Sequence, residues 1–136
     1  GDGGAVSLDP GLRLFLLGHP GVAAEVEARF SPDPLPEGEA LPAITYLDVD
    51  ELGSYSNDGP NCLVKARYQL SHWAQTKEEA ARVEQTTRGV MDGYQAGWPD
   101  GWRIMGVFGR ATRSMYEPET KLWRVISDYQ IRAIGD

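Results

Sequence analysis

The sequence has little of several features that would point to a particular compartment or chemistry. Cys62 is the only cysteine among 136 residues, so the chain cannot form an internal disulfide, which fits a reducing compartment. No apolar run approaches the roughly 18 residues that a membrane-spanning helix needs. The start of the chain lacks a basic region and a small-residue cleavage site, so we expect neither a signal peptide nor a membrane partner.

Basic residues are also scarce. The chain has 13 Lys and Arg against 20 Asp and Glu, for a formal net charge of −7. Residues 1–60 hold 11 acids and 2 bases, giving −9, whereas residues 61–136 hold 9 acids and 11 bases, giving +2. This balance disfavours nucleic-acid binding, which depends mainly on Lys and Arg at phosphates. Opposite charge in the two halves favours self-association, in which one half meets the other half of a neighbour.

Motifs of enzymes and metal proteins are missing as well. The sequence contains no G-x-S-x-G, no P-loop and no G-x-G-x-x-G. The residues His19, His72 and Cys62 lack metal-ligand spacing, and we expect His72 to be a satisfied, partly buried strand residue. Glu117 and Glu119 could be paired catalytic carboxylates only in an enclosing site, and a solvated turn is expected instead. We therefore predict no catalytic site, no cofactor and no metal.

The first part of the chain predicts a helix, an irregular arm and a strand. Asp9 followed by Pro10 is typical of a helix start, with Asp9 as the N-cap. A short second helical turn and a short strand ending near Phe30 are expected to follow. Residues 31–42 contain four prolines, which remove backbone donors, so this arm is expected to be irregular and exposed. The β-forming run at 43–49 predicts a strand.

The middle of the chain predicts a loop, a half-buried strand and a capped helix. Residues 51–61 have the Gly, Ser, Asn, Asp and Pro content of a long loop. Residues 62–74 alternate between apolar and polar side chains, which predicts an antiparallel strand with one buried face. Thr76 and Glu79 form a capping box at the start of a long helix predicted over 76–93.

The last part of the chain predicts a hairpin. Residues 102–115 and 121–134 have the pattern of two long strands, and "YEPET" at 116–120 lies between them. Pro118 cannot donate to a strand ladder, and its φ suits a tight turn, so the chain is expected to reverse there.

Together these elements predict an α+β fold. We expect an antiparallel sheet of about four strands, with the long helix and an N-terminal helix packed on one face. The whole chain, 1–136, is expected to form a single domain in which residues 31–42 and 51–61 are mobile loops.

Three stretches, in this order and spacing, resemble one protein family. They are "LPAITY" at 41–46, "ARYQLSHWAQTKEEA" at 66–80 and "MYEPETKLWRVISDYQI" at 115–131. The set resembles the small tail completion proteins of long-tailed phages, also called tail terminators or head–tail joining proteins. The resemblance covers roughly residues 10–134, and it leaves open a phage, a prophage remnant or a gene-transfer particle. The "GDGG" start and the bulky "GWPDGW" connection depart from the family pattern.

The resemblance implies a structural virion protein and not an enzyme. It implies a homohexameric ring on the head-proximal end of the tail tube, located in the tail–neck region of the virion and assembled in the host cytoplasm. The implied partners are other copies of the chain, the tail tube protein, a neck or head completion protein, and DNA that passes through the lumen without sequence-specific binding. Two alternatives stay open, namely a neck adaptor on the portal side and a small α+β enzyme with an enclosed pocket.

Candidate interface residues lie on the predicted central strand and the closing hairpin. The basic face of 62–74 could serve a nucleic-acid platform, but a solvated sheet face or a subunit contact suits the negative net charge better. The hairpin tip could contact a ring neighbour or the tube, or it could be only a good turn. The candidates are Lys65, Arg67, Tyr116, Glu117, Glu119, Arg124 and Arg132.

Overall fold

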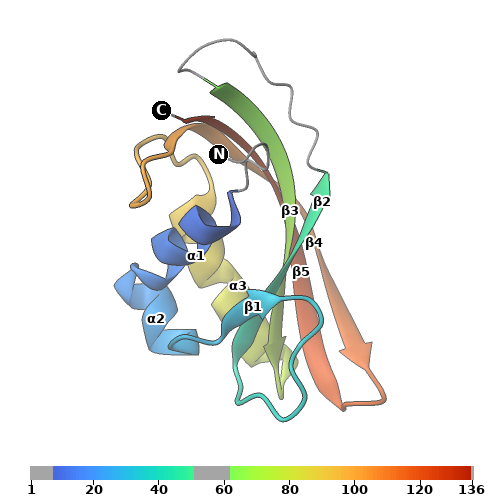
Figure 1. Ribbon diagram of the computed structural model, residues 1–136. Coiled ribbons are helices and arrows are strands. Elements are labelled where there is room, and N and C mark those ends of the chain that lie inside the picture. Colours follow the sequence, from blue (N-terminus) through green and yellow to red (C-terminus); the bar gives the residue numbers. More distant parts are fainter. Residues whose placement is uncertain (1–7, 51–61, 136) are drawn as a thin grey trace.

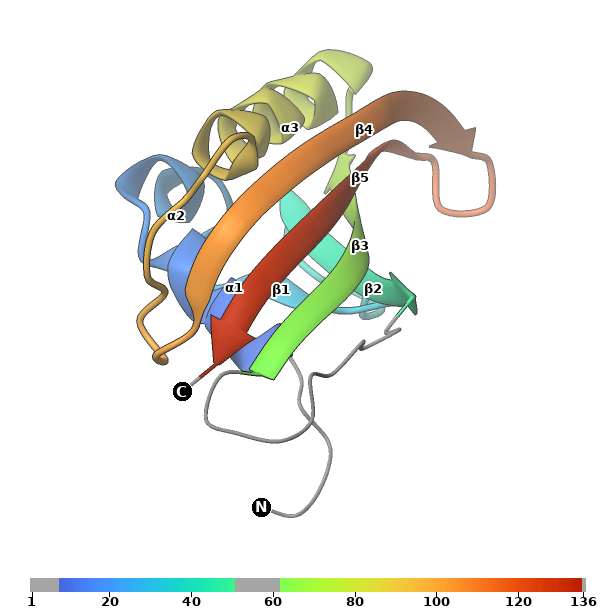
Figure 2. The same cartoon turned by 90° about the horizontal axis from the view of Figure 1, so that it is seen from above.

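A computed structural model of the chain describes residues 8–50 and 62–135. Its helices are α1 (Asp9–Leu17), α2 (Pro20–Val26) and α3 (Lys77–Met91). Its strands are β1 (Phe30–Pro32), β2 (Ala43–Asp50), β3 (Cys62–Ala74), β4 (Arg103–Glu117) and β5 (Leu122–Gly135). The predicted α+β class is confirmed, and the helices pack against one face of a strongly curved sheet (Figures 1 and 2). None of the described helices is long and apolar enough to cross a membrane.

The sheet has five strands in the order β1-β2-β3-β5-β4, not the four that the sequence predicted. The extra strand is β1, which pairs parallel to β2 with Phe30 opposite Ile44. A strand was expected to end near Phe30, but it begins there and extends into the proline-rich arm. The Phe30 ring is buried and stacks on Tyr46 at 5.1 Å, so aromatic packing holds this short strand in place.

The N-terminal helix begins one residue earlier than expected. Leu8 occupies the N-cap position without a side-chain cap, and Asp9 is the first helical residue. The Asp9 carboxylate instead accepts a hydrogen bond from the Tyr68 hydroxyl, which extends from the fully buried Tyr68 ring on β3. A buried hydroxyl needs a partner, and this tertiary contact displaces the local cap.

The alternation predicted for β3 is confirmed, and so is the Thr76 half of the capping box predicted for α3. Val64, Ala66, Tyr68 and Leu70 of β3 are all buried on the helix side of the sheet. At the start of α3, the Thr76 side chain accepts a hydrogen bond from the Glu79 backbone N–H at 3.1 Å. The resulting core includes Leu12 and Leu16 of α1, Val83 and Met91 of α3, and Tyr129 and Ile131 of β5.

The closing hairpin is also confirmed. β4 and β5 pair antiparallel from Glu117 and Leu122 back along the sheet, and the Lys121 N–H donates to the Glu117 carbonyl at 2.8 Å. Pro118 opens the turn as predicted. Lys121 closes it with a φ of 60°, a left-handed conformation that the sequence pattern did not indicate for a lysine.

Replacing Pro118 with alanine tests the role of its fixed φ. We expect the free energy of unfolding to fall by about 0.4–1 kcal/mol, because alanine gives the unfolded chain more conformations. Glu119→Ala in the same turn is the control and should stay within about 0.5 kcal/mol of wild type. Urea denaturation measures both. A Pro118→Ala protein as stable as wild type would show that the turn does not depend on the ring.

Candidate interaction surfaces

Five of the seven candidate residues share the sheet face that lies opposite the helices, which we call the open sheet face. It consists of the residues of β3, β4 and β5 whose side chains point away from the core. Lys65 lies directly opposite Arg132, and both side chains are exposed. Arg67 makes a 3.4 Å ion pair with Asp128, and Arg132 lies over the Phe108 ring at 6.0 Å.

The candidates at the hairpin end do not all lie on the same face of the sheet. Glu117 lies opposite Leu122 on the open sheet face, and its carboxylate is 3.9 Å from the Arg124 guanidinium. Tyr116 faces the helix side, where its ring packs against Trp123 at 5.2 Å while 47% of the residue stays exposed. Glu119 is exposed in the turn. The seven residues therefore do not form one patch.

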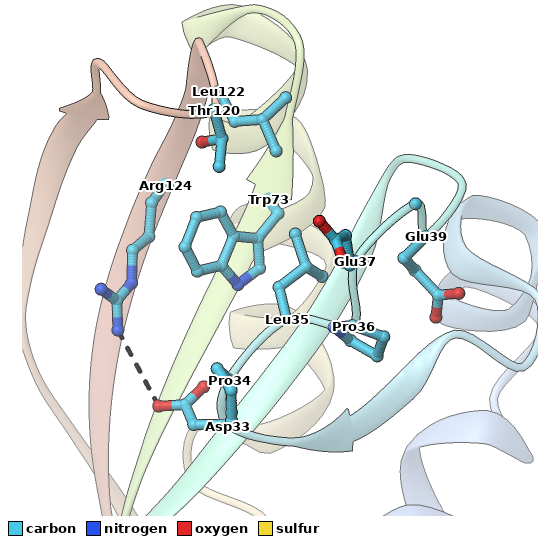
Figure 3. A pocket seen from close by; sticks show the side chains of 11 residues that line it. Asp33, Pro34, Leu35, Pro36, Glu37, Glu39, Trp73, Thr120, Leu122 and Arg124 are labelled. Carbon is cyan, nitrogen blue, oxygen red and sulfur yellow. Dashed lines mark ion pairs between the residues drawn. The ribbon is translucent and has the colours of Figure 1, made fainter.

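A pocket of about 690 Å³ lies where the proline-rich arm meets the open sheet face. Its walls are the arm residues 33–39 on one side and Leu122, Thr120 and Arg124 of the hairpin on the other. Figure 3 shows Trp73 between Leu35 and Arg124 in this pocket. We call it the arm pocket.

Hydrogen bonds and ring contacts fix the floor of the arm pocket. The Trp73 indole N–H donates to Thr45 Oγ1 at 2.9 Å, which fixes the orientation of the ring. The Arg124 guanidinium lies 4.9 Å from the Trp73 ring centroid, and its Nε donates to Ser71 Oγ at 3.0 Å. A cation held over an indole is a stable arrangement, so this wall is pre-formed.

The arm pocket is apolar at its floor and acidic at its rim. Leu35, Trp73 and Leu122 supply apolar surface, whereas the arm contributes Asp33, Glu37 and Glu39. Arg124 is the single cation among the lining residues, and it is 3.9 Å from Asp33 (Figure 3). Sequence reasoning missed this site, although the acids interleaved with prolines in the arm were a visible hint.

A second surface that sequence reasoning missed is the exposed side-chain surface of β4. β4 is the last strand of the sheet, with β5 on one edge. On the other edge the Ile104 N–H donates to the Ala96 carbonyl at 2.8 Å, and the Val107 carbonyl accepts from the Gly93 N–H at 3.1 Å. Residues 103–110 of β4, "RIMGVFGR", expose Met105 to 45% and Phe108 to 53%. Arg103 and Arg110 are exposed at the two ends of this run, and no described carboxylate lies within ion-pair distance of either. We call residues 103–110 the β4 rim.

A buried polar cluster lies on the helix side of the sheet. The Glu84 carboxylate on α3 accepts from Ser127 Oγ at 2.7 Å and from Arg88 Nη2 at 2.7 Å. The hydrogen bond from Arg88 to Glu84 raises the pKa of Arg88, and burial raises the pKa of Tyr129 beside them. The cluster joins α3 to β5, so its geometry serves packing.

His72 is more deeply buried than the sequence predicted. It is 0% exposed, and its Nδ1–H donates to the Val125 carbonyl at 2.9 Å. Its Nε2 has no hydrogen-bond partner among the described residues, so the prediction of a satisfied histidine is correct for only one nitrogen. Burial lowers the pKa of His72 to about 4. Among the described residues, no three His, Cys, Asp or Glu side chains are grouped as metal ligands.

Comparison with known families gives a match over residues 11–133 to the model of the tail completion protein gp17. The chain belongs to this family. The resemblance that three sequence motifs suggested is therefore confirmed, and the protein is a structural, virion-associated tail protein of a phage-like particle. No curated protein matches the chain in sequence.

The fold of this family member is also found in a solved particle. The chain is similar to one from the virion of a native gene transfer agent (GTA) particle, with a TM-score of 0.69 and 13% sequence identity. The similarity covers 96% of this chain and 100% of that one. At this identity the likeness establishes a shared fold.

Proposed function

We propose that this tail completion protein is a tail terminator. In this proposal six copies form a ring that caps the head-proximal end of the tail tube and stops its growth. The ring offers its other side to a neck or head completion protein, and DNA passes through its lumen. The observation that carries the proposal is the family match, which spans nearly the whole described chain.

The distribution of charge supports a ring. A ring needs two different surfaces on each subunit that meet head to tail. Residues 8–50 hold eight acids and two bases, giving −6, and residues 62–135 hold eight acids and 11 bases, giving +3. One part of each subunit can therefore attract another part of its neighbour. The net negative charge of the whole chain suits a conduit that does not hold DNA.

The proposal predicts a tail-length phenotype. Particles assembled without this protein should show over-long tails or heads without tails, because nothing stops the tube or joins it to the neck. Electron microscopy of particles made with and without the wild-type protein measures this. Tails of normal length attached to heads in its absence would overturn the proposal. Normal tube length with unjoined heads would instead favour an adaptor on the portal side.

Charge at the hairpin tip can be tested separately. Glu117→Gln with Glu119→Gln should change the free energy of unfolding by less than about 0.5 kcal/mol, because both carboxylates are at least partly solvated. We expect the double variant to melt like wild type yet to give particles with defective tail completion, because the tip contacts the tube or a ring neighbour. Normal particles from this variant would show that the hairpin serves only the fold.

A further inference from the structure

We propose that neighbouring copies in the ring meet through the β4 rim of one subunit seated in the arm pocket of the next. This inference rests on the proposed ring. It assigns the two surfaces of the head-to-tail contact, and it states that the arm pocket is occupied by a second copy of this chain.

Charge complementarity is the first argument for this pairing. The pocket side of the arm, residues 33–39, carries three carboxylates and no base, whereas the β4 rim, residues 103–110, carries two arginines and no acid. No described cation lies within ion-pair distance of the Glu37 or Glu39 carboxylate. Likewise, no described carboxylate lies within ion-pair distance of either rim arginine. Among the described residues of one subunit these four charges have no ion-pair partner, and the proposed contact pairs them with each other.

Apolar surface is the second argument. The arm pocket has an apolar floor of Leu35, Trp73 and Leu122, and its volume of about 690 Å³ is large enough for several side chains. The β4 rim presents Met105 and Phe108, each about half exposed. Aromatic and methionine side chains that enter a pre-formed pocket are typical anchors of protein interfaces, with charged residues around them.

The position of the two surfaces in the sheet is the third argument. The arm continues directly from β1, at one edge of the sheet, and the rim belongs to β4, at the other edge. A contact between unlike edges is head to tail, so repeating it can close a ring.

Charge reversal tests the contact. One variant carries Glu37→Arg with Glu39→Arg, a second carries Arg103→Glu with Arg110→Glu, and a third carries all four changes. Ring formation on purified tail tubes is measured by electron microscopy and by native mass. We expect each double variant to lose rings by about tenfold or more, since like charges then face each other. The four-change variant should recover them, since the attraction is restored with opposite sign.

A matched control separates this contact from a general effect of charge. Glu27→Arg with Glu78→Arg raises the net charge by the same amount as the arm variant, but these residues lie outside both surfaces, so this control should form rings like wild type. Melting curves show that every variant is folded. Rings from both double variants, or no rings from the folded four-change variant, would overturn the inference.

The same experiment distinguishes this inference from the proposed function. If wild-type protein forms no ring on tubes and tails end normally without it, the proposed function fails and the inference fails with it. If the wild-type ring forms and the arm variant keeps the ring but no longer joins heads, the arm pocket binds the neck protein. That result would overturn the inference but would not contradict the proposed tail-terminator function.

Discussion

Replacing Glu84 with alanine is expected to lower the free energy of unfolding by about 3 kcal/mol. The Glu84 side chain is only 6% exposed, and its carboxylate is the acceptor for Ser127 and Arg88. Removing it leaves the buried Ser127 hydroxyl without the carboxylate that accepts its hydrogen bond, and it removes the ion pair that joins Glu84 to Arg88. The Arg88 side chain is 36% exposed and can regain water, which places the loss at the lower end for a broken buried pair.

Two variants on the same helix make the Glu84 measurement specific. Glu84→Gln keeps an oxygen that can accept from Ser127, so it should lose clearly less stability than alanine. Glu78→Ala removes an exposed carboxylate and should stay within about 0.5 kcal/mol of wild type. Guanidinium chloride denaturation followed by fluorescence gives all three values. A Glu84→Ala protein as stable as the Glu78→Ala protein would show that the cluster contributes nothing to folding.

Lowering the pH from about 6.5 to about 4 is expected to remove about 3 kcal/mol of stability through His72 alone. In the unfolded chain His72 takes up a proton near its ordinary pKa of 6.5, whereas burial lowers its pKa to about 4 in the folded protein. Within this window the unfolded state binds more protons, so stability falls as the pH falls. Well above pH 6.5 both states are neutral at this residue, and its contribution to stability is constant.

Burial explains why the folded protein resists protonation of His72, although the hydrogen bond to the Val125 carbonyl by itself favours the charged ring and so raises the pKa. The Val125 carbonyl can only accept, so Nδ1 already carries a hydrogen and a second proton would have to go to Nε2. That atom is buried and has no acceptor beside it among the described residues. The nearby Glu84 favours the charged ring and Arg88 opposes it, but burial is the largest effect.

His72→Asn separates this histidine from the carboxylates that also titrate in acid. The asparagine amide can donate to the Val125 carbonyl, but it does not titrate. Stability is measured by urea denaturation at half-unit steps from pH 4 to pH 8. The wild-type curve should fall more steeply than the variant curve between pH 6.5 and pH 4, and the two should run parallel above that window. Parallel curves throughout would show that His72 titrates normally.

Local patterns allowed much of the fold to be predicted from the sequence. The alternation in 62–74 depends only on which side chains face the core, and the capping box at Thr76 joins residues three apart. The turn after Glu117 was indicated by one proline, Pro118. Each of these features is decided by neighbours in the sequence, so a pattern can reveal it.

Features decided by distant residues could not be predicted. The parallel pairing of β1 places Phe30 opposite Ile44, and the arm lies between them in the sequence. The Asp9 carboxylate contacts the Tyr68 hydroxyl, which lies far along the sequence. The short strand expected to end near Phe30 instead begins there, and it joins the sheet as a fifth strand beyond the roughly four predicted, because a three-residue strand carries no periodic pattern that fixes its bounds or its partner. The loop predicted at 51–61 lies outside the described residues.

The interface candidates show the same limit. Alternation along β3 and β5 correctly grouped Lys65, Arg67 and Arg132, because residues two apart share a face of a strand. The arm pocket needs the arm to fold back to Trp73 and Arg124, which are about 40 and 90 residues away in sequence. The β4 rim became visible only when the strand order placed β4 at the edge.

The place of β5 in the sheet has a consequence for the protein during its synthesis. Strands β3 and β4 lie on either side of β5 and form their long ladders with it, yet the ribosome makes β5 after both of them. The nascent chain therefore holds two long, unsatisfied strand edges until β5 has left the exit tunnel. Folding of the sheet is completed after synthesis of the last strand, and a chain stalled within β5 remains a substrate for chaperones and proteases.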